Sequence, residues 1–122
     1  MSIQFKTIAE LRSMLDSKAI SSKEIVEETY KLIDGNADLN AFITLNKEAA
    51  IAKSIEIEST SAKSVLHGIP IAQKDLFCTK DLRTTCGSNI LSNFIPPYSA
   101  TVIKNLENAG CISIGKTNMD EF

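Results

Sequence analysis

Two short apolar runs, residues 69–72 and 111–115, stand on either side of a segment with helical periodicity. Runs of this length, bounded by glycine and polar residues, are typical of buried strands. Between them Ser99 or Thr101 can begin a helix and Gly110 can end it, and its apolar face is formed by Val102, Ile103, Leu106 and Ala109. A strand, a helix and a second strand favour a right-handed crossover between parallel strands. The sequence therefore predicts an α/β fold, with an incomplete mixed or parallel sheet and flanking helices.

The first 65 residues carry mostly helical signals. Capping boxes at Thr7 and Ser21 each precede apolar residues at helical spacing. These patterns and the turn formers between them predict a helix over residues 8–17, a helix from 22 to about 34–36, a strand over 41–45 and a helix from its cap Asn46 to Glu58. We expect residues 1–122 to form a single incomplete domain, in which 1–65 are a largely helical lead-in.

Length and charge exclude several classes of protein. A chain of 122 residues suits one domain with a core. No apolar run approaches the length of a membrane span, and the start MSIQFKTIAE lacks the features of a secretion signal, so we expect a cytoplasmic protein. A net charge of −2 and a pI near 5.4 are atypical of a chain that binds nucleic acid directly through a basic face.

The three cysteines and the single histidine show no metal-binding pattern. Cys78, Cys86 and Cys111 form no C-x-x-C pair, and His67 is not spaced as a partner for them. We predict no metal site and expect free thiols in a reducing compartment. A nucleophilic Cys78 or Cys86 is the alternative interpretation, although cysteines in apolar sequence more often serve packing.

Lys74 stands at the end of the first apolar run, where the sequence predicts a strand leaving the core. An ammonium group held against apolar walls has a lowered pKa and can become a proton acceptor near neutral pH. Lys74 is therefore a candidate general base. The structural alternative is a lysine at a strand exit that pairs with Asp75 or is solvated, because lysines are rarely fully buried.

From Leu66 onward, the segments LHGIPIAQKDLFCTKDLRTTCGSNIL and FIPPYSATVIKNLENAGCISIGKTNMDEF resemble the amino-terminal part of an amidase signature enzyme. The resemblance implies that residues 66–122 begin the catalytic core. In this family the lysine of the GIPIAxKD block belongs to a Ser-cisSer-Lys triad, and Lys74 matches that lysine. Thr84, Thr85, Gly87 and Ser88 resemble the stretch that lines the same substrate pocket. The departures are Gln73, where an aliphatic residue is usual, and Asp81, which replaces a frequent glycine.

Within the family, the chain resembles the A subunits of the glutamyl-tRNA(Gln) and aspartyl-tRNA(Asn) amidotransferases. That resemblance implies glutamine hydrolysis to supply ammonia for misacylated Glu-tRNA(Gln), with subunits B and C as partners. It implies no cofactor in this chain, ATP and Mg bound by a neighbouring protein of the complex, and only indirect contact with tRNA. The alternatives are an amidase that acts on small amides without tRNA and a non-catalytic truncated domain.

The two triad serines of the family lie in a Gly/Ser-rich segment, and no Gly-Ser-Ser-Gly run occurs in these 122 residues. We therefore expect a fragment of a longer protein that is inactive alone. A second motif, G-x-x-x-x-G-K-T from Gly110 to Thr117, satisfies the phosphate-loop pattern by its letters. Because an apolar strand, Cys-Ile-Ser-Ile, occupies the place of the loop, we predict that it does not bind phosphate.

Overall fold

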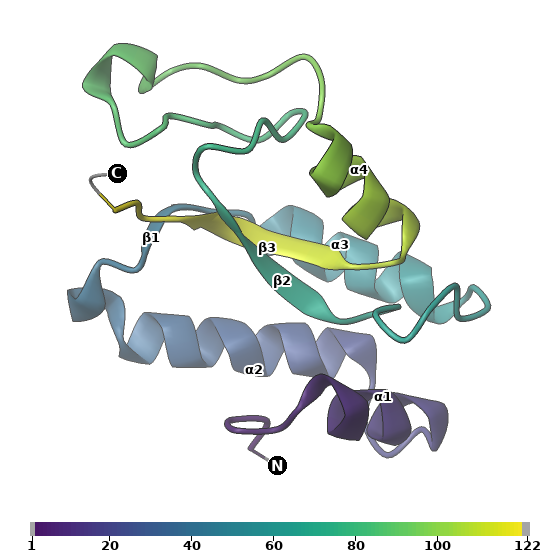
Figure 1. The fold of residues 1–122 in the computed structure, drawn as a ribbon. Coiled ribbons are helices and arrows are strands. Elements are labelled where there is room, and N and C mark those ends of the chain that lie inside the picture. Colours follow the sequence, from purple (N-terminus) through teal and green to yellow (C-terminus); the bar gives the residue numbers. More distant parts are fainter. Residues whose placement is uncertain (1, 121–122) are drawn as a thin grey trace.

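The computed structural model describes residues 2–120. Its elements in chain order are α1 (Ile8–Asp16), α2 (Ser22–Gly35), the 3-10 turn η1 (Ala37–Leu39), β1 (Phe42–Leu45), α3 (Lys47–Glu58), β2 (Pro70–Lys74), the 3-10 turn η2 (Asn89–Leu91), α4 (Thr101–Asn108) and β3 (Ile112–Thr117). Figure 1 shows α2 below the sheet, and α4 with the long segment between β2 and α4 above it. The predicted α/β class is confirmed.

The sheet has three strands in the order β1-β3-β2. Strands β2 and β3 are parallel neighbours joined through α4, as the strand-helix-strand pattern predicts. Strand β1 pairs with β3 in the antiparallel direction, so the sheet is mixed. The lead-in residues thus contribute a strand to the same sheet as residues 66–122.

The helix starts follow local capping chemistry. At Thr7 and Ser21 both halves of the predicted capping box are formed, with Glu10 and Glu24 as the reciprocal acceptors. The predicted cap at Asn46 is wrong, because its side chain makes no capping bond. Instead, the Asn46 side-chain amide donates to the Ser113 carbonyl at 3.2 Å, which fastens the start of α3 to β3.

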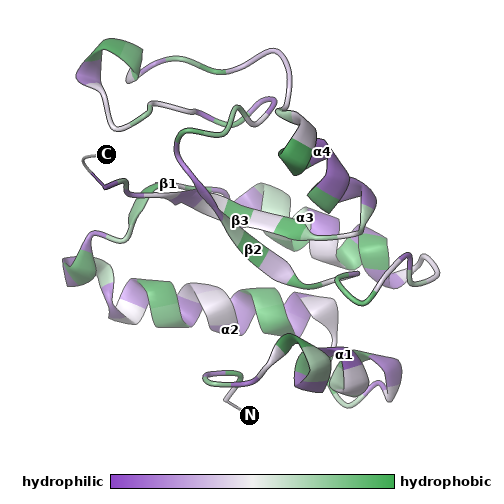
Figure 2. Cartoon of the chain, viewed as in Figure 1, coloured by the Kyte–Doolittle hydropathy of each residue, from purple (hydrophilic) through white to green (hydrophobic). Residues whose placement is uncertain are grey.

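Two groups of buried side chains hold the helices on the sheet. The larger group joins α2, α3 and β3 and consists of Val26, Tyr30, Ala50, Ile57, Ile112 and Ile114. The second group seats α1 against the start of α2 and the residue before β2, and consists of Leu11, Ile20, Ile25 and Ile69. Helix α4 separates its residue types, as Figure 2 shows by apolar colour on one side and polar colour on the other. Ile103 is its buried contact, whereas Val102 is exposed despite its place in the predicted apolar face.

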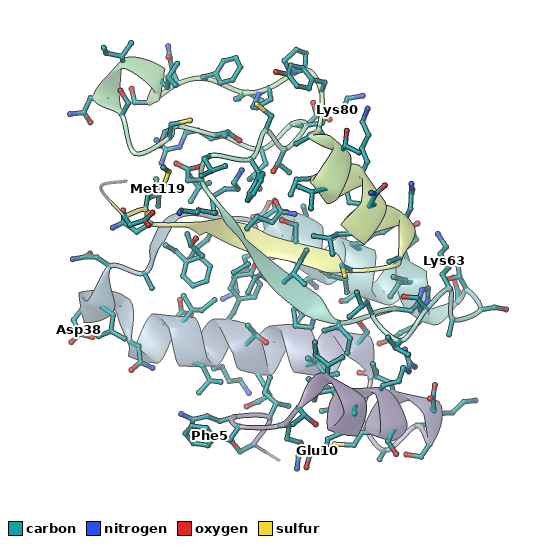
Figure 3. All side chains as sticks on the ribbon, viewed as in Figure 1. Phe5, Glu10, Asp38, Lys63, Lys80 and Met119 are labelled. Atoms are coloured by element: carbon teal, nitrogen blue, oxygen red, sulfur yellow. The ribbon has the colours of Figure 1, made fainter. Side chains whose placement is uncertain are left out.

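The segment from Phe77 to Tyr98 leaves the end of β2 and returns to α4 with little regular structure. Arg83 ties it to the sheet, because its guanidinium donates to the Thr44 hydroxyl at 3.1 Å, the Ile43 carbonyl at 3.2 Å and the Ser92 carbonyl at 2.9 Å. In Figure 3, Met119, just past β3, lies near this segment, and Phe5 and Glu10 lie beyond α2. Within residues 2–120 no helix is both long enough and apolar enough to cross a bilayer.

Candidate functional site

Lys74 is the last residue of β2, and its side chain is 37% exposed. Its ammonium nitrogen lies 2.5 Å from a carboxylate oxygen of Asp120, just past β3. The hydrogen bond from Lys74 lowers the pKa of Asp120 below its usual value. The alternative pairing with Asp75 is therefore wrong, and the desolvation expected for a general base is not present around Lys74 within residues 2–120.

The buried lysine of this region is Lys116, in β3, whose exposed fraction is zero. Its ammonium group donates to the Phe77 carbonyl, to the Thr79 hydroxyl at 3.0 Å and to the Thr84 hydroxyl at 3.1 Å. Burial lowers the pKa of Lys116, and the nearby acidic group of Asp75 opposes that shift. All three ammonium hydrogens of Lys116 thus have an acceptor from the segment that follows β2.

Asp75 and Gln73 point into the same interior as Lys116. The Asp75 carboxylate is fully buried and accepts from the Thr85 backbone N–H at 3.1 Å and from the Thr85 hydroxyl. The Gln73 side-chain carbonyl accepts from the Thr79 hydroxyl at 2.9 Å. One oxygen of Asp75 and the amide nitrogen of Gln73 have no partner among the described atoms. Gln73 and Lys74 therefore point to opposite faces, as strand alternation predicts.

The four residues that resemble a substrate pocket lie on the segment after β2, in two different environments. Thr84 and Thr85 are buried, and their hydroxyls are engaged by Lys116 and Asp75 respectively. Gly87 is exposed with a φ of 67°. The Ser88 hydroxyl accepts from the Ile90 N–H at 3.2 Å and so caps η2. The role of these four residues in a pocket stays a prediction, while their internal bonds explain why the segment has a defined course.

Strand β3 runs further than predicted, to Thr117 rather than Gly115. Gly115, Lys116 and Thr117 are therefore strand residues, and no phosphate loop forms at them. A side chain at Gly115 would place its Cβ 2.5 Å from the Thr44 carbonyl oxygen, so the close approach of β1 requires glycine. The signal that could have identified Lys116 is its place directly after a buried strand, at Ile112 and Ile114; the phosphate-loop letters indicate a different property.

The three cysteines are unbridged and occupy different environments. Cys111 is buried, which raises the pKa of its thiol, while Cys86 is exposed and Cys78 is half-buried. Cys78 donates weakly to the Tyr98 hydroxyl at 3.8 Å. Across residues 2–120, no three side chains of His, Cys, Asp or Glu are gathered as a metal site would need.

Comparison with known proteins connects this geometry to a family. The sequence profile of the family described as Amidase matches residues 24–122. The A subunit of the glutamyl-tRNA(Gln) amidotransferase of Coxiella burnetii (strain Dugway 5J108-111) is 51% identical over 121 residues, which are 96% of this chain and 25% of that protein. Its counterpart in Natranaerobius thermophilus is 48% identical over 127 residues, which cover 100% of this chain and 26% of that protein.

Solved structures give the same result for the fold. The native peptide amidase of Stenotrophomonas maltophilia superposes with a TM-score of 0.90 at 26% identity, over 97% of this chain and 26% of that chain. An amidase family protein from Bacillus anthracis superposes with a TM-score of 0.87 at 29% identity, over 98% of this chain and 25% of that chain. The chain thus spans about a quarter of the length of the relatives it matches. Because both its sequence and its fold match over nearly all of its residues, the chain belongs to the amidase signature family.

Proposed function

We propose that Lys74 is the proton acceptor of a glutaminase that supplies ammonia for the amidation of misacylated Glu-tRNA(Gln). The observation that supports this role is its position: Lys74 ends β2 on the face opposite to the buried network and meets only Asp120. Its ammonium can leave that exposed ion pair at small cost, because surface pairs contribute little. Lys116, by contrast, has its three hydrogens bonded inside the protein.

The proposed chemistry is covalent catalysis by an activated hydroxyl. A neutral Lys74 amine accepts the proton of a bridging serine, which takes the proton of the nucleophilic serine as that oxygen bonds to the amide carbon. The proton returns through the bridging serine to the leaving nitrogen, and ammonia departs. Water then cleaves the acyl-enzyme ester to give glutamate and free serine. Both serines lie outside these 122 residues in this proposal, so the 122-residue chain alone is inactive.

The partners follow from the names of the relatives, which are subunits of an amidotransferase. We propose subunits B and C as partners, cytoplasmic assembly, and ATP with Mg at one of these partners, where it activates the misacylated tRNA. A second candidate function is hydrolysis of small amides without tRNA. The likeness to a peptide amidase at a TM-score of 0.90 favours that candidate.

The experiment uses the complete product of the reading frame that encodes these residues. Glutamine hydrolysis and hydrolysis of a peptide amide are measured for the wild type, for Lys74→Ala and for Lys104→Ala, an exposed lysine on α4. We expect Lys74→Ala to lose at least about 100-fold in kcat, as for loss of a general base, with Lys104→Ala unchanged. Wild-type activity in Lys74→Ala would remove Lys74 from the mechanism. Peptide amide hydrolysis without glutaminase activity would favour the second candidate.

A further inference from the structure

The two chain neighbours of Lys74 are both anchored inside the protein. Gln73 accepts from Thr79 at 2.9 Å, and Asp75 accepts from the backbone of Thr85 at 3.1 Å. Successive side chains of a strand point to opposite faces. With Gln73 and Asp75 committed to the interior, Lys74 is directed to the opposite face at the end of β2. Its position therefore depends on the bonds that hold its neighbours.

Lys116 lies at the centre of those bonds. It is the register partner of Gln73 across the parallel pair, and the Thr79 hydroxyl that receives its hydrogen bond also donates to Gln73. Its other acceptors, the Phe77 carbonyl and the Thr84 hydroxyl, lie on the same connecting segment. The ionisable groups around it are Asp75, Cys78 and Cys86. One buried cation thus joins β3 to the end of β2 and to the segment that follows it.

Stability alone does not account for this arrangement. A buried charge needs a complete set of partners, and packed apolar residues of similar volume often stabilise a protein equally well. A hydrogen-bonded cation adds a directional requirement, because its acceptors must lie at fixed places around one nitrogen. Here those acceptors are the residues that determine where β2 ends.

We propose that Lys116 is a positioning residue for the reaction of Lys74, acting through Thr79 and Gln73 to hold Lys74 at a fixed place. This inference rests on the proposed role of Lys74 as proton acceptor. It assigns no contact between Lys116 and the substrate. Its consequence is kinetic, because a catalytic group displaced by about 1 Å can lose up to about 100-fold in rate.

The first test replaces Lys116 with methionine, which retains length without charge, in the complete product of the reading frame. Active sites are counted with a fluorophosphonate that labels the nucleophilic serine, so unfolded protein does not enter the rate. We expect kcat per labelled site to fall about 10- to 100-fold, with KM within about threefold. The matched control is Lys104→Met on the exposed surface of α4, which keeps the wild-type kcat.

A second pair of variants decides the matter where Lys116→Met does not fold. Thr79→Val removes the hydroxyl between Lys116 and Gln73 with little change of shape, and Thr79→Ser retains it. We expect kcat per labelled site to fall in Thr79→Val and to return in Thr79→Ser. A readout independent of turnover is the acetylation rate of Lys74 by acetic anhydride, measured by mass spectrometry relative to Lys104. That ratio changes several-fold in Thr79→Val and not in Thr79→Ser.

The outcomes separate this inference from the proposed function. If Lys74→Ala retains activity, the proposed function fails and the role of Lys116 fails with it. If Lys74→Ala is inactive while Thr79→Val and folded Lys116→Met keep the wild-type kcat per labelled site, only the positioning role is overturned. A lower melting temperature with unchanged kcat identifies Lys116 as a structural residue alone.

Discussion

Lys74 and Lys116 lie near the same end of two parallel strands, yet one is exposed to solvent and the other is completely buried. Lys74 is paired in register with Thr117, whereas Lys116 is paired with Gln73. This offset of one residue places the two ammonium groups on opposite faces of the sheet. The comparison teaches that the position of a lysine along a strand does not decide its burial; the face of the sheet and the segment packed there do.

The largest expected effect separates the two lysines by stability. Lys116→Met leaves three oxygen atoms without their donor and leaves buried Asp75 without its nearby cation. We expect its free energy of unfolding to fall by about 3–5 kcal/mol, as when one partner of a buried charge pair is removed. Lys74→Met removes only an exposed pair and should change that free energy by no more than about 0.5 kcal/mol. Urea unfolding of the two variants measures both values, and equal losses would contradict the comparison.

A smaller effect appears in the dependence of stability on alkaline pH. Because burial lowers the pKa of Lys116 below the ordinary 10.5, the folded protein loses this proton before the unfolded chain does. Stability therefore rises as pH increases from the lowered pKa toward about 10.5, and Lys116→Met abolishes the rise. Burial raises the pKa of Tyr30 to about 12, so its contribution acts in the opposite direction and is lost between about pH 10 and 12.

These two contributions are separated by measuring urea unfolding from pH 8 to pH 12, in steps of about one unit, in the wild type and in Tyr30→Phe. Tyr30→Phe removes the decline above about pH 10 and keeps the rise below it. Tyr30 donates to the Ile114 carbonyl at 2.7 Å, so the variant also has a lower stability at all pH values. A rise that persists in Lys116→Met would assign it to another group.

The smallest expected effect concerns the exposed partner of Lys74. The bond from Lys74 holds the pKa of Asp120 below 3.8, so the stability it contributes is present above that pH and is lost as pH falls through the lowered value. In Lys74→Met the Asp120 carboxyl should titrate at its ordinary pKa. Carbon-13 NMR of the Asp120 carboxyl between about pH 2 and 6 measures the change. Identical titration in both proteins would show that the ion pair does not form in solution.

Much of the fold was predictable because its signals are local. The capping boxes at Thr7 and Ser21, the apolar periodicity behind them and the glycine that ends α4 act within a few residues of the chain. The parallel pairing of β2 and β3 followed from their order with a helix between them. The cap at Asn46 was wrong because tertiary contact with Ser113 competes for its side chain. Asp81, at a position where the family often has glycine, has a φ of 63°, which explains the preference for glycine there.

The sequence by itself determined the class of fold, the order of its elements and Lys74 as the residue that matches the family lysine. The tertiary structure decided that Lys74 is exposed and paired with Asp120, that Lys116 is buried, and that Thr84 and Thr85 serve internal bonds. The physical reason is that helix caps and strand periodicity depend on neighbours in the chain. Burial of a charge depends on acceptors that a distant segment brings to one nitrogen, and only folding places Phe77, Thr79 and Thr84 around Lys116.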